Sequence, residues 1–126
     1  MMLIPTRVAP SPIHGLGLFT LTAVSVGTPV CVFDLRYDAR FTQEEVAAMP
    51  PLMRAFVERF GFPDQDEPGL VCVEFDNGRF MNHADPPNLI QDGVYARAAG
   101  DLVAGEELTY DYRLVGLRVA GFNGRP

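Results

Sequence analysis

The chain has 126 residues, of which 48% are hydrophobic and 21% are charged, and its formal net charge is −6. This length predicts one domain spanning residues 1–126, and the balance of apolar and charged residues excludes a wholly disordered chain. An acidic surface repels phosphate backbones, which argues against nucleic acid as a partner and favours a basic peptide. Solubility alone also explains the acidic charge.

The cysteines and histidines do not have the number or spacing of a zinc site, so no metal is predicted. Cys31 and Cys72 each lie in an apolar, strand-like stretch, which predicts buried free thiols and a cytoplasmic protein. No signal peptide is expected. The uncharged stretch 8–33 is interrupted by glycines and prolines, so no membrane span is expected either.

Strand signals dominate the first part of the chain. Glycines and prolines between residues 10 and 17 predict an irregular loop. Residues 24–26 and 30–33 are rich in valine and flank Gly27-Thr28-Pro29, a pattern that predicts two strands joined by a turn.

A helical insertion is predicted in the middle of the chain. Thr42 and Glu45 have the spacing of a capping box, so a short helix should run from there to about Met49. The pair Pro50-Pro51 ends this helix, and its second proline can start another. Four apolar residues of the second helix recur at helical spacing and should face the core: Leu52, Phe56, Val57 and Phe60.

The second half returns to strand signals. Residues 70–75, 94–98 and 107–112 are predicted strands, and Asn77-Gly78 predicts a hairpin turn after the first of them. The expected fold class is therefore mainly β with one short helical insertion.

Two segments carry groups suited to a binding site. In His14-Gly15-Leu16-Gly17-Leu18-Phe19, two glycines allow the backbone to approach a ligand closely, although a tight turn between strands explains them equally well. In residues 79–88, Asn82-His83 places hydrogen-bonding side chains beside an apolar stretch. A structural Asn-His pair with satisfied hydrogen bonds is the alternative interpretation.

A third segment, residues 105–112, contains two tyrosines at strand spacing. Alternation sends Tyr110 and Tyr112 to the same face, where two phenols could line an apolar channel. Two half-buried tyrosines in a sheet are the simpler alternative.

Taken in order, the three segments resemble the SET domain of protein-lysine methyltransferases. That family carries Gly-x-Gly-x-Phe, then Arg-Phe-x-Asn-His-Ser-x-x-Pro-Asn, then Gly-Glu-Glu-Leu-Thr-x-Asp-Tyr. The resemblance covers residues 7–112 and leaves residues 113–126 as a C-terminal tail. It implies a SET-type fold of short curved β-sheets, in which the chain around the Asn-His motif passes beneath the last motif to form a pseudoknot.

The resemblance also implies S-adenosylmethionine as the cofactor. By matching position, the backbone of Gly15, Leu16 and Gly17 should hold its methionine part. Asn82 should hydrogen-bond its amino group, and His83 should contact its adenine, largely through the backbone.

The same matching gives the catalytic residues and the partner. Tyr112 matches the catalytic tyrosine, and Tyr110 matches the position that governs how many methyl groups are added. The implied activity is methyl transfer to a lysine of a protein or peptide substrate. The C-terminal tail, residues 113–126, should form part of the lysine channel.

Departures from the family pattern leave alternatives open. Ala84 replaces the usual serine, and no tyrosine lies between Tyr37 and Tyr95, where many members carry another active-site tyrosine; the nearest candidates are Phe60 and Phe62. A non-catalytic SET-fold binding module is therefore the main alternative, and a small-amine methyltransferase is a third. The substrate protein, the methylation number and homodimer formation are left open.

Overall fold

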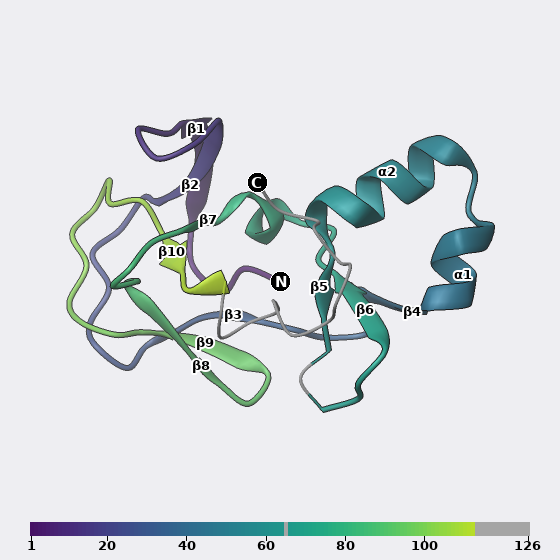
Figure 1. The fold of residues 1–126 in the computed structure, drawn as a ribbon. Coiled ribbons are helices and arrows are strands. Elements are labelled where there is room, and N and C mark those ends of the chain that lie inside the picture. Colours follow the sequence, from purple (N-terminus) through teal and green to yellow (C-terminus); the bar gives the residue numbers. More distant parts are fainter. Residues whose placement is uncertain (65, 113–126) are drawn as a thin grey trace.

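The computed structural model describes residues 1–64 and 66–112, which form four small β-sheets and a helical insertion (Figure 1). The predicted mainly β fold is confirmed. Two sheets have three strands, in the order β3-β9-β8 and β4-β6-β5, and two have a pair, β1-β2 and β10-β7. The strands are β1 (Thr6–Pro10), β2 (Leu16–Thr20), β3 (Pro29–Val32), β4 (Ala39–Thr42), β5 (Phe62–Pro63), β6 (Leu70–Val73), β7 (Asn82–His83), β8 (Leu89–Asp92), β9 (Tyr95–Ala98) and β10 (Thr109–Tyr110).

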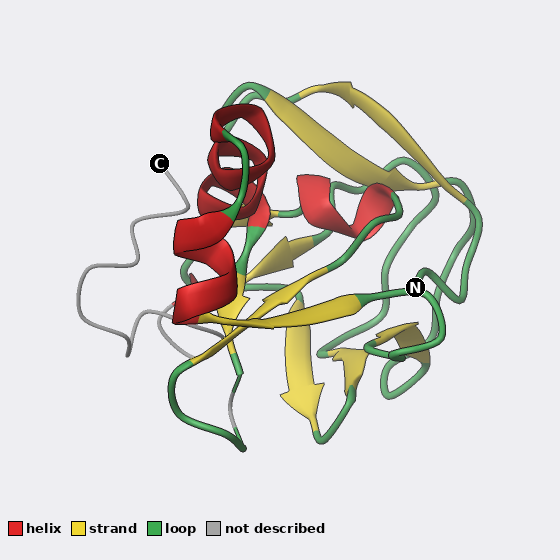
Figure 2. Cartoon of the chain, turned by 90° about the vertical axis from the view of Figure 1, so that its right-hand side faces the viewer, coloured by secondary structure: helices red, strands yellow, loops and turns green. Residues whose placement is uncertain are grey.

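The helical insertion consists of α1 (Gln43–Ala48) and α2 (Pro51–Phe60), and Figure 2 looks onto it. The predicted capping box is confirmed: the Glu45 amide donates to the Thr42 hydroxyl over 3.1 Å, and the Thr42 amide donates to the Glu45 carboxylate over 2.7 Å. No helix of the described residues is long and apolar enough to cross a membrane.

Two apolar clusters form the core. The larger joins β2, β3, β8 and β9 to the segments that carry the last two motifs, and the smaller lies between the insertion and β6. In the insertion, Val57 is buried and Phe56 packs against the smaller cluster, as predicted. The prediction is wrong for Leu52, which is 87% exposed. Residues 51–53 at the start of α2 are all exposed, and Val57 is the buried residue of the helix.

The predicted hairpin turn at Asn77-Gly78 is wrong. These residues begin a 3-10 helix, η1 (Asn77–Phe80), because the Asp76 carboxylate accepts the Gly78 amide hydrogen over 2.9 Å. The chain then continues into β7, which pairs with β10 in parallel and does not fold back onto β6.

Several predicted strands are shorter than expected, and the one predicted over residues 70–75 ends at Val73. Of residues 24–26, only Val24 forms a bridge, with Leu102. Of residues 107–112, only Thr109–Tyr110 is a strand, because the Asn88 side chain pairs with the neighbouring backbone: its amide donates to the Glu107 carbonyl, and its oxygen accepts from the Thr109 amide, each over 2.8 Å. The prediction of buried free thiols is confirmed for both cysteines.

Asp64 ties the loop after β5 to the sheet β4-β6-β5. Its carboxylate accepts the amides of Asp66 and Glu67, contacts the Cys72 thiol at 3.3 Å and forms an ion pair with Arg40 at 2.7 Å. Burial alone would raise the pKa of Asp64, but these hydrogen bonds and the Arg40 charge outweigh it and lower the pKa.

We expect Asp64→Asn to lower the free energy of unfolding by about 2–3 kcal/mol, because it leaves the Arg40 charge without its buried partner. The pKa of Asp64 in the folded protein lies below the ordinary value of 3.8. The contribution of Asp64 to the free energy of unfolding is therefore fully present above pH 3.8 and is lost as the pH falls through the folded pKa. Urea unfolding of the two proteins at pH 7 and at lower pH measures both effects.

Asp92→Asn is the matched control. Asp92 pairs with Arg97 over the same 2.7 Å, but its side chain is 62% exposed against 5% for Asp64. Exposed pairs contribute at most about 1 kcal/mol, so an equal loss in both variants would contradict the role of burial at Asp64.

Candidate functional site

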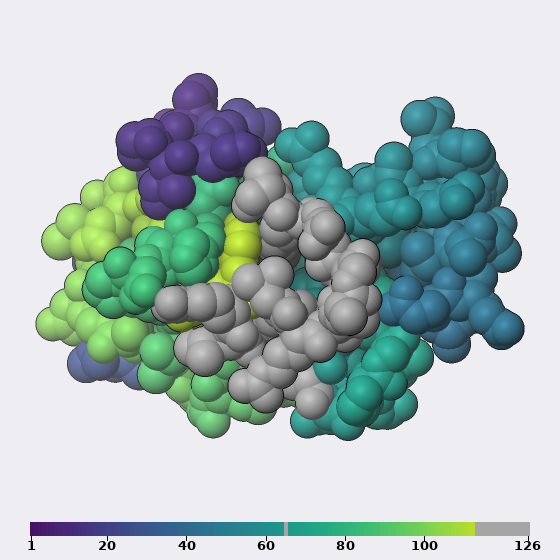
Figure 3. Space-filling view, viewed as in Figure 1, coloured from purple at the N-terminus to yellow at the C-terminus, as the bar shows by residue number. Residues whose placement is uncertain are grey.

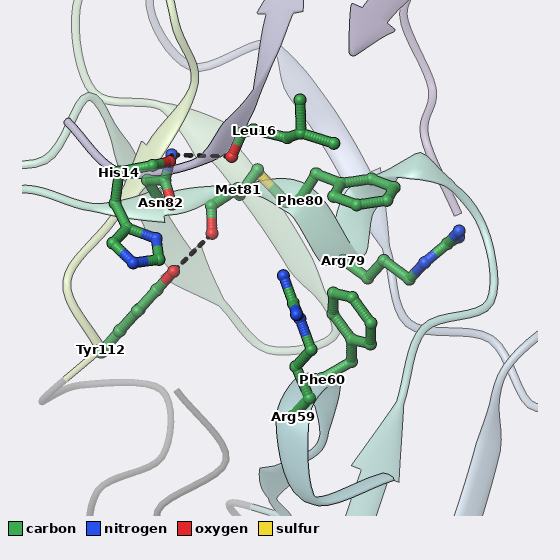
Figure 4. A pocket seen from close by; sticks show the side chains of 9 residues that line it. All are labelled: His14, Leu16, Arg59, Phe60, Arg79, Phe80, Met81, Asn82 and Tyr112. Atoms are coloured by element: carbon green, nitrogen blue, oxygen red, sulfur yellow. Dashed lines mark hydrogen bonds between the residues drawn. The ribbon is translucent and has the colours of Figure 1, made fainter. Parts of the chain in front are cut away.

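A pocket lies where the glycine-containing hairpin, the Asn-His segment and the end of α2 meet (Figure 4). Its empty space amounts to about 400 Å³ when the open solvent at its mouth is included. In Figure 3 the β1–β2 hairpin and the helical insertion stand apart at the upper edge of the molecule. The pocket is lined by His14, Leu16, Arg59, Phe60, Arg79, Phe80, Met81, Asn82 and Tyr112.

The glycine segment forms the turn and second strand of the β1–β2 hairpin. Gly15 has a φ of +45°, a region that favours glycine, and its carbonyl accepts the Ser11 amide that closes the turn. Gly17 is buried, and a Cβ there would overlap the Glu107 carboxylate. Leu16, between them, reaches the pocket wall. Gly17 thus permits a close approach of the Glu107 side chain to the backbone, whereas the predicted approach of a ligand to the two glycines stays a prediction.

Asn82 connects this loop to the other two motifs. It is 8% exposed, and its amide nitrogen lies 3.0 Å from the His14 carbonyl, 3.0 Å from the Leu16 carbonyl and 2.9 Å from the Glu107 carboxylate. All three neighbours are acceptors, which orients the nitrogen toward the loop. Within residues 1–64 and 66–112, no protein donor pairs with the amide oxygen of Asn82.

Tyr112 and His83 lie against each other beside the pocket. The Tyr112 hydroxyl donates to the Met81 carbonyl over 2.6 Å, and its amide donates to Nδ1 of His83 over 3.0 Å (Figure 4 shows the first bond). The rings are 5.3 Å apart. The His83 side chain therefore binds the backbone of the last motif, and the predicted contact of its own backbone with the adenine stays a prediction.

Tyr110 is placed differently from Tyr112. Its hydroxyl lies 3.3 Å from the sulfur of Cys31, and its ring packs against the larger core cluster. Burial raises the pKa of the Cys31 thiol to about 12, so the sulfur stays protonated at neutral pH. The expected alternation along residues 107–112 ends with the short strand at Tyr110, and the lining of the described pocket includes Tyr112 but not Tyr110.

Sequence reasoning missed two arginines. Figure 4 shows the Arg59 guanidinium directed into the pocket and Arg79 extending past Phe80. Arg79 stacks on the Phe80 ring at 4.5 Å and donates to the carbonyls of Phe75 and Asp76. A charged residue in the last turn of α2 was the only sequence signal for Arg59, and such residues are usually solvated.

Phe60 and Phe62, the two candidates for the position of the family's additional active-site tyrosine, lie in different places. Phe60, predicted to face the core, lines the pocket with its ring 5.7 Å from that of Phe80. Phe62 instead packs against Phe33, with ring centres 5.9 Å apart. Phe60 therefore occupies this wall of the pocket without supplying a hydroxyl. The predicted tail, residues 113–126, lies outside the described residues.

A known protein family matches most of this sequence. A family model described as the SET domain matches residues 15–113, which include the pocket-lining residues from Leu16 to Tyr112. No curated protein matches the chain. Because the model covers well over half of the sequence and all but the start of its first motif, the chain belongs to the SET-domain family.

Proposed function

We propose that this chain transfers a methyl group from S-adenosylmethionine to the ε-amine of a lysine in a protein or peptide substrate. The observation that carries the proposal is the meeting of three separate motifs in one pocket: Leu16, Asn82 and Tyr112 line it together. Members of the SET-domain family are commonly lysine methyltransferases that use this cofactor. An acidic chain with net charge −6 suits a basic substrate.

The polar groups of the pocket suit the amino-acid end of S-adenosylmethionine. The Asn82 amide oxygen and the carbonyls of His14 and Leu16 are acceptors for an ammonium group. Arg59 directs a positive charge into the same pocket, which suits a carboxylate (Figure 4). The backbone at His83 would contact the adenine. These residues would hold the cofactor without any metal.

The reaction requires a neutral amine. A free lysine has a pKa of ~10.4, so deprotonation at pH 7 costs ~4.6 kcal/mol. A dry channel and a nearby positive charge both lower this pKa, which removes the need for a dedicated general base. The bound cofactor supplies an electrophilic methyl group on a sulfonium. Tyr112 would orient the reacting centre, because its bond to the Met81 carbonyl fixes the direction of its hydroxyl.

A non-catalytic binding module is the second candidate, favoured by Phe60, which lines the pocket where many relatives have a tyrosine. Transfer to a small amine is the third. Incubation with labelled S-adenosylmethionine and cell lysate distinguishes the three candidates: label in protein bands supports lysine transfer, label only in small molecules supports the third candidate, and no label supports the second.

The cytoplasmic location and the absence of nucleic-acid and membrane partners stay predictions.

Cofactor binding tests the pocket itself. We expect calorimetry in the presence of a chelator to show S-adenosylmethionine binding, and Asn82→Ala to weaken it by about 1–3 kcal/mol, because a hydrogen bond to a charged group is lost. Asn77→Ala, at an exposed asparagine of η1, is the control. A folded wild-type protein that binds no cofactor would remove the basis of the proposed function.

Tyr112→Phe removes only the hydroxyl. We expect methyl transfer to fall by roughly 10–1000-fold while cofactor affinity changes much less, because the hydroxyl acts on the reacting centre. Single-turnover assays and calorimetry measure the two quantities. Tyr37→Phe, at an exposed tyrosine, should leave both unchanged. Full turnover in Tyr112→Phe would show that Tyr112 is only a structural tyrosine.

Tyr110→Phe tests the methylation number. The hydroxyl lies 3.3 Å from the Cys31 sulfur in the free protein, and the family resemblance places Tyr110 at the lysine channel, where its oxygen would leave little room for a methylated amine. We expect its removal to raise the proportion of di- and trimethyl-lysine while the first transfer is kept. Mass spectrometry of methylated substrate measures this, with Tyr95→Phe as the control. An unchanged product distribution at comparable turnover would place Tyr110 outside the lysine channel.

A further inference from the structure

Glu107 lies at the centre of the contacts that shape the glycine loop. Its carboxylate accepts from the Ser11 hydroxyl, with its two oxygens 2.8 and 2.9 Å away, and from the Asn82 amide at 2.9 Å. It also fills the space beside Gly17 that any Cβ would need. One side chain from the last motif therefore contacts both ends of the loop and the key residue of the second motif.

The partners of this carboxylate carry no charge. Ser11 and Asn82 donate neutral hydrogen bonds, and no arginine, lysine or histidine of the described residues forms an ion pair with Glu107. Because its hydrogen-bond donors are neutral, the negative charge of Glu107 is not compensated by a partner. Together with the nearby carbonyl acceptors of the glycine loop, this charge attracts a cation. By contrast, Arg40 and Arg97 each pair with a carboxylate elsewhere in the chain.

The same contacts orient Asn82. Because Glu107 and the two loop carbonyls surround its amide nitrogen, its oxygen is turned away from them. Loss of the Glu107 acceptor would remove one of the three groups that favour this orientation. Glu107 thus acts on a ligand in two ways: through the orientation of Asn82, and through its own charge.

We propose that Glu107 is a positioning residue that recognises the ammonium group of the cofactor's amino-acid end. It does so by orienting the Asn82 oxygen, bracing the loop through Ser11, and supplying the negative charge behind these acceptors. This inference rests on the proposed function, since it takes the pocket to bind an adenosyl amino acid.

Glu107→Gln separates the charge from the shape. A glutamine can keep its oxygen toward Asn82 and Ser11 and can donate to the Ser11 oxygen with its nitrogen, so the loop contacts survive while the charge is lost. Glu106→Gln is the matched control, because it removes the same charge one residue away, where the carboxylate accepts the Val103 amide. Thermal unfolding of each variant without ligand checks that the fold is kept.

The test is calorimetry with three ligands and the full chain: S-adenosylhomocysteine, its decarboxylated analogue that keeps the amine, and 5′-methylthioadenosine, which has neither group. We expect Glu107→Gln to weaken the first two by roughly tenfold or more and the third by less than about twofold. Glu106→Gln should change none by more than about twofold. Glu107→Asp, which keeps the charge, should bind the two amines more tightly than Glu107→Gln, and it replaces that variant if the glutamine protein does not fold.

The outcomes distinguish the inference from the proposed function. If the wild type binds S-adenosylhomocysteine but Glu107→Gln weakens all three ligands equally, or none, Glu107 is a structural clamp only and the inference is overturned while the function stands. If the folded wild type binds none of the three, the proposed function fails, and the inference fails with it.

Discussion

The backbone of residues 107–110 runs between two segments that are distant in sequence, and every candidate site residue depends on that arrangement. On one side the Leu108 amide donates to the Leu18 carbonyl of β2, and on the other Thr109 pairs with Asn82 of β7. Asn88 adds side-chain bonds to the same stretch. This crossing, on which the expected pseudoknot depends, brings the glycine loop and the Asn-His motif to one pocket.

The pocket owes its polarity to how these backbones pack. The loop residues His14 and Leu16 line the pocket together with Asn82, whose amide nitrogen binds the Glu107 carboxylate outside the lining, and Arg59 enters from the end of α2. A site with acceptors on one side and a cation on the other suits a zwitterionic ligand, because each end meets the opposite charge. Tyr112 lies between, tied to the Met81 carbonyl.

The helical insertion has two roles. Its buried face, centred on Val57, packs on β6 through the smaller cluster, and its last turn supplies Arg59 and Phe60 to the pocket. A change in the insertion can therefore alter both stability and the site. Phe60 gives this wall an aromatic surface that carries no hydroxyl.

Local features were determined by the sequence. The sequence predicted the capping box at Thr42, the proline start of α2 and the buried thiols, because each depends on residues a few positions apart. It also predicted the three motifs, because their residues match the pattern of a family. At two other places a side chain that bonds to the backbone overturns the predicted element. The Asp76 carboxylate accepts the Gly78 amide, so Asn77-Gly78 begins a 3-10 helix, and the Asn88 side chain takes the place of a strand partner beside Thr109.

Only the tertiary structure decided which residues meet. Periodicity placed Leu52 in the core, but an exposed helix end depends on how much sheet lies beneath it. Arg59 reaches the pocket because α2 ends there, and Glu107 contacts Ser11 across 96 positions of the chain. The contact of Glu107 with Ser11 depends on the crossing of residues 107–110 between β2 and β7. Spacing along the sequence carries no information about that crossing, because the elements involved are paired through long-range backbone hydrogen bonds and burial.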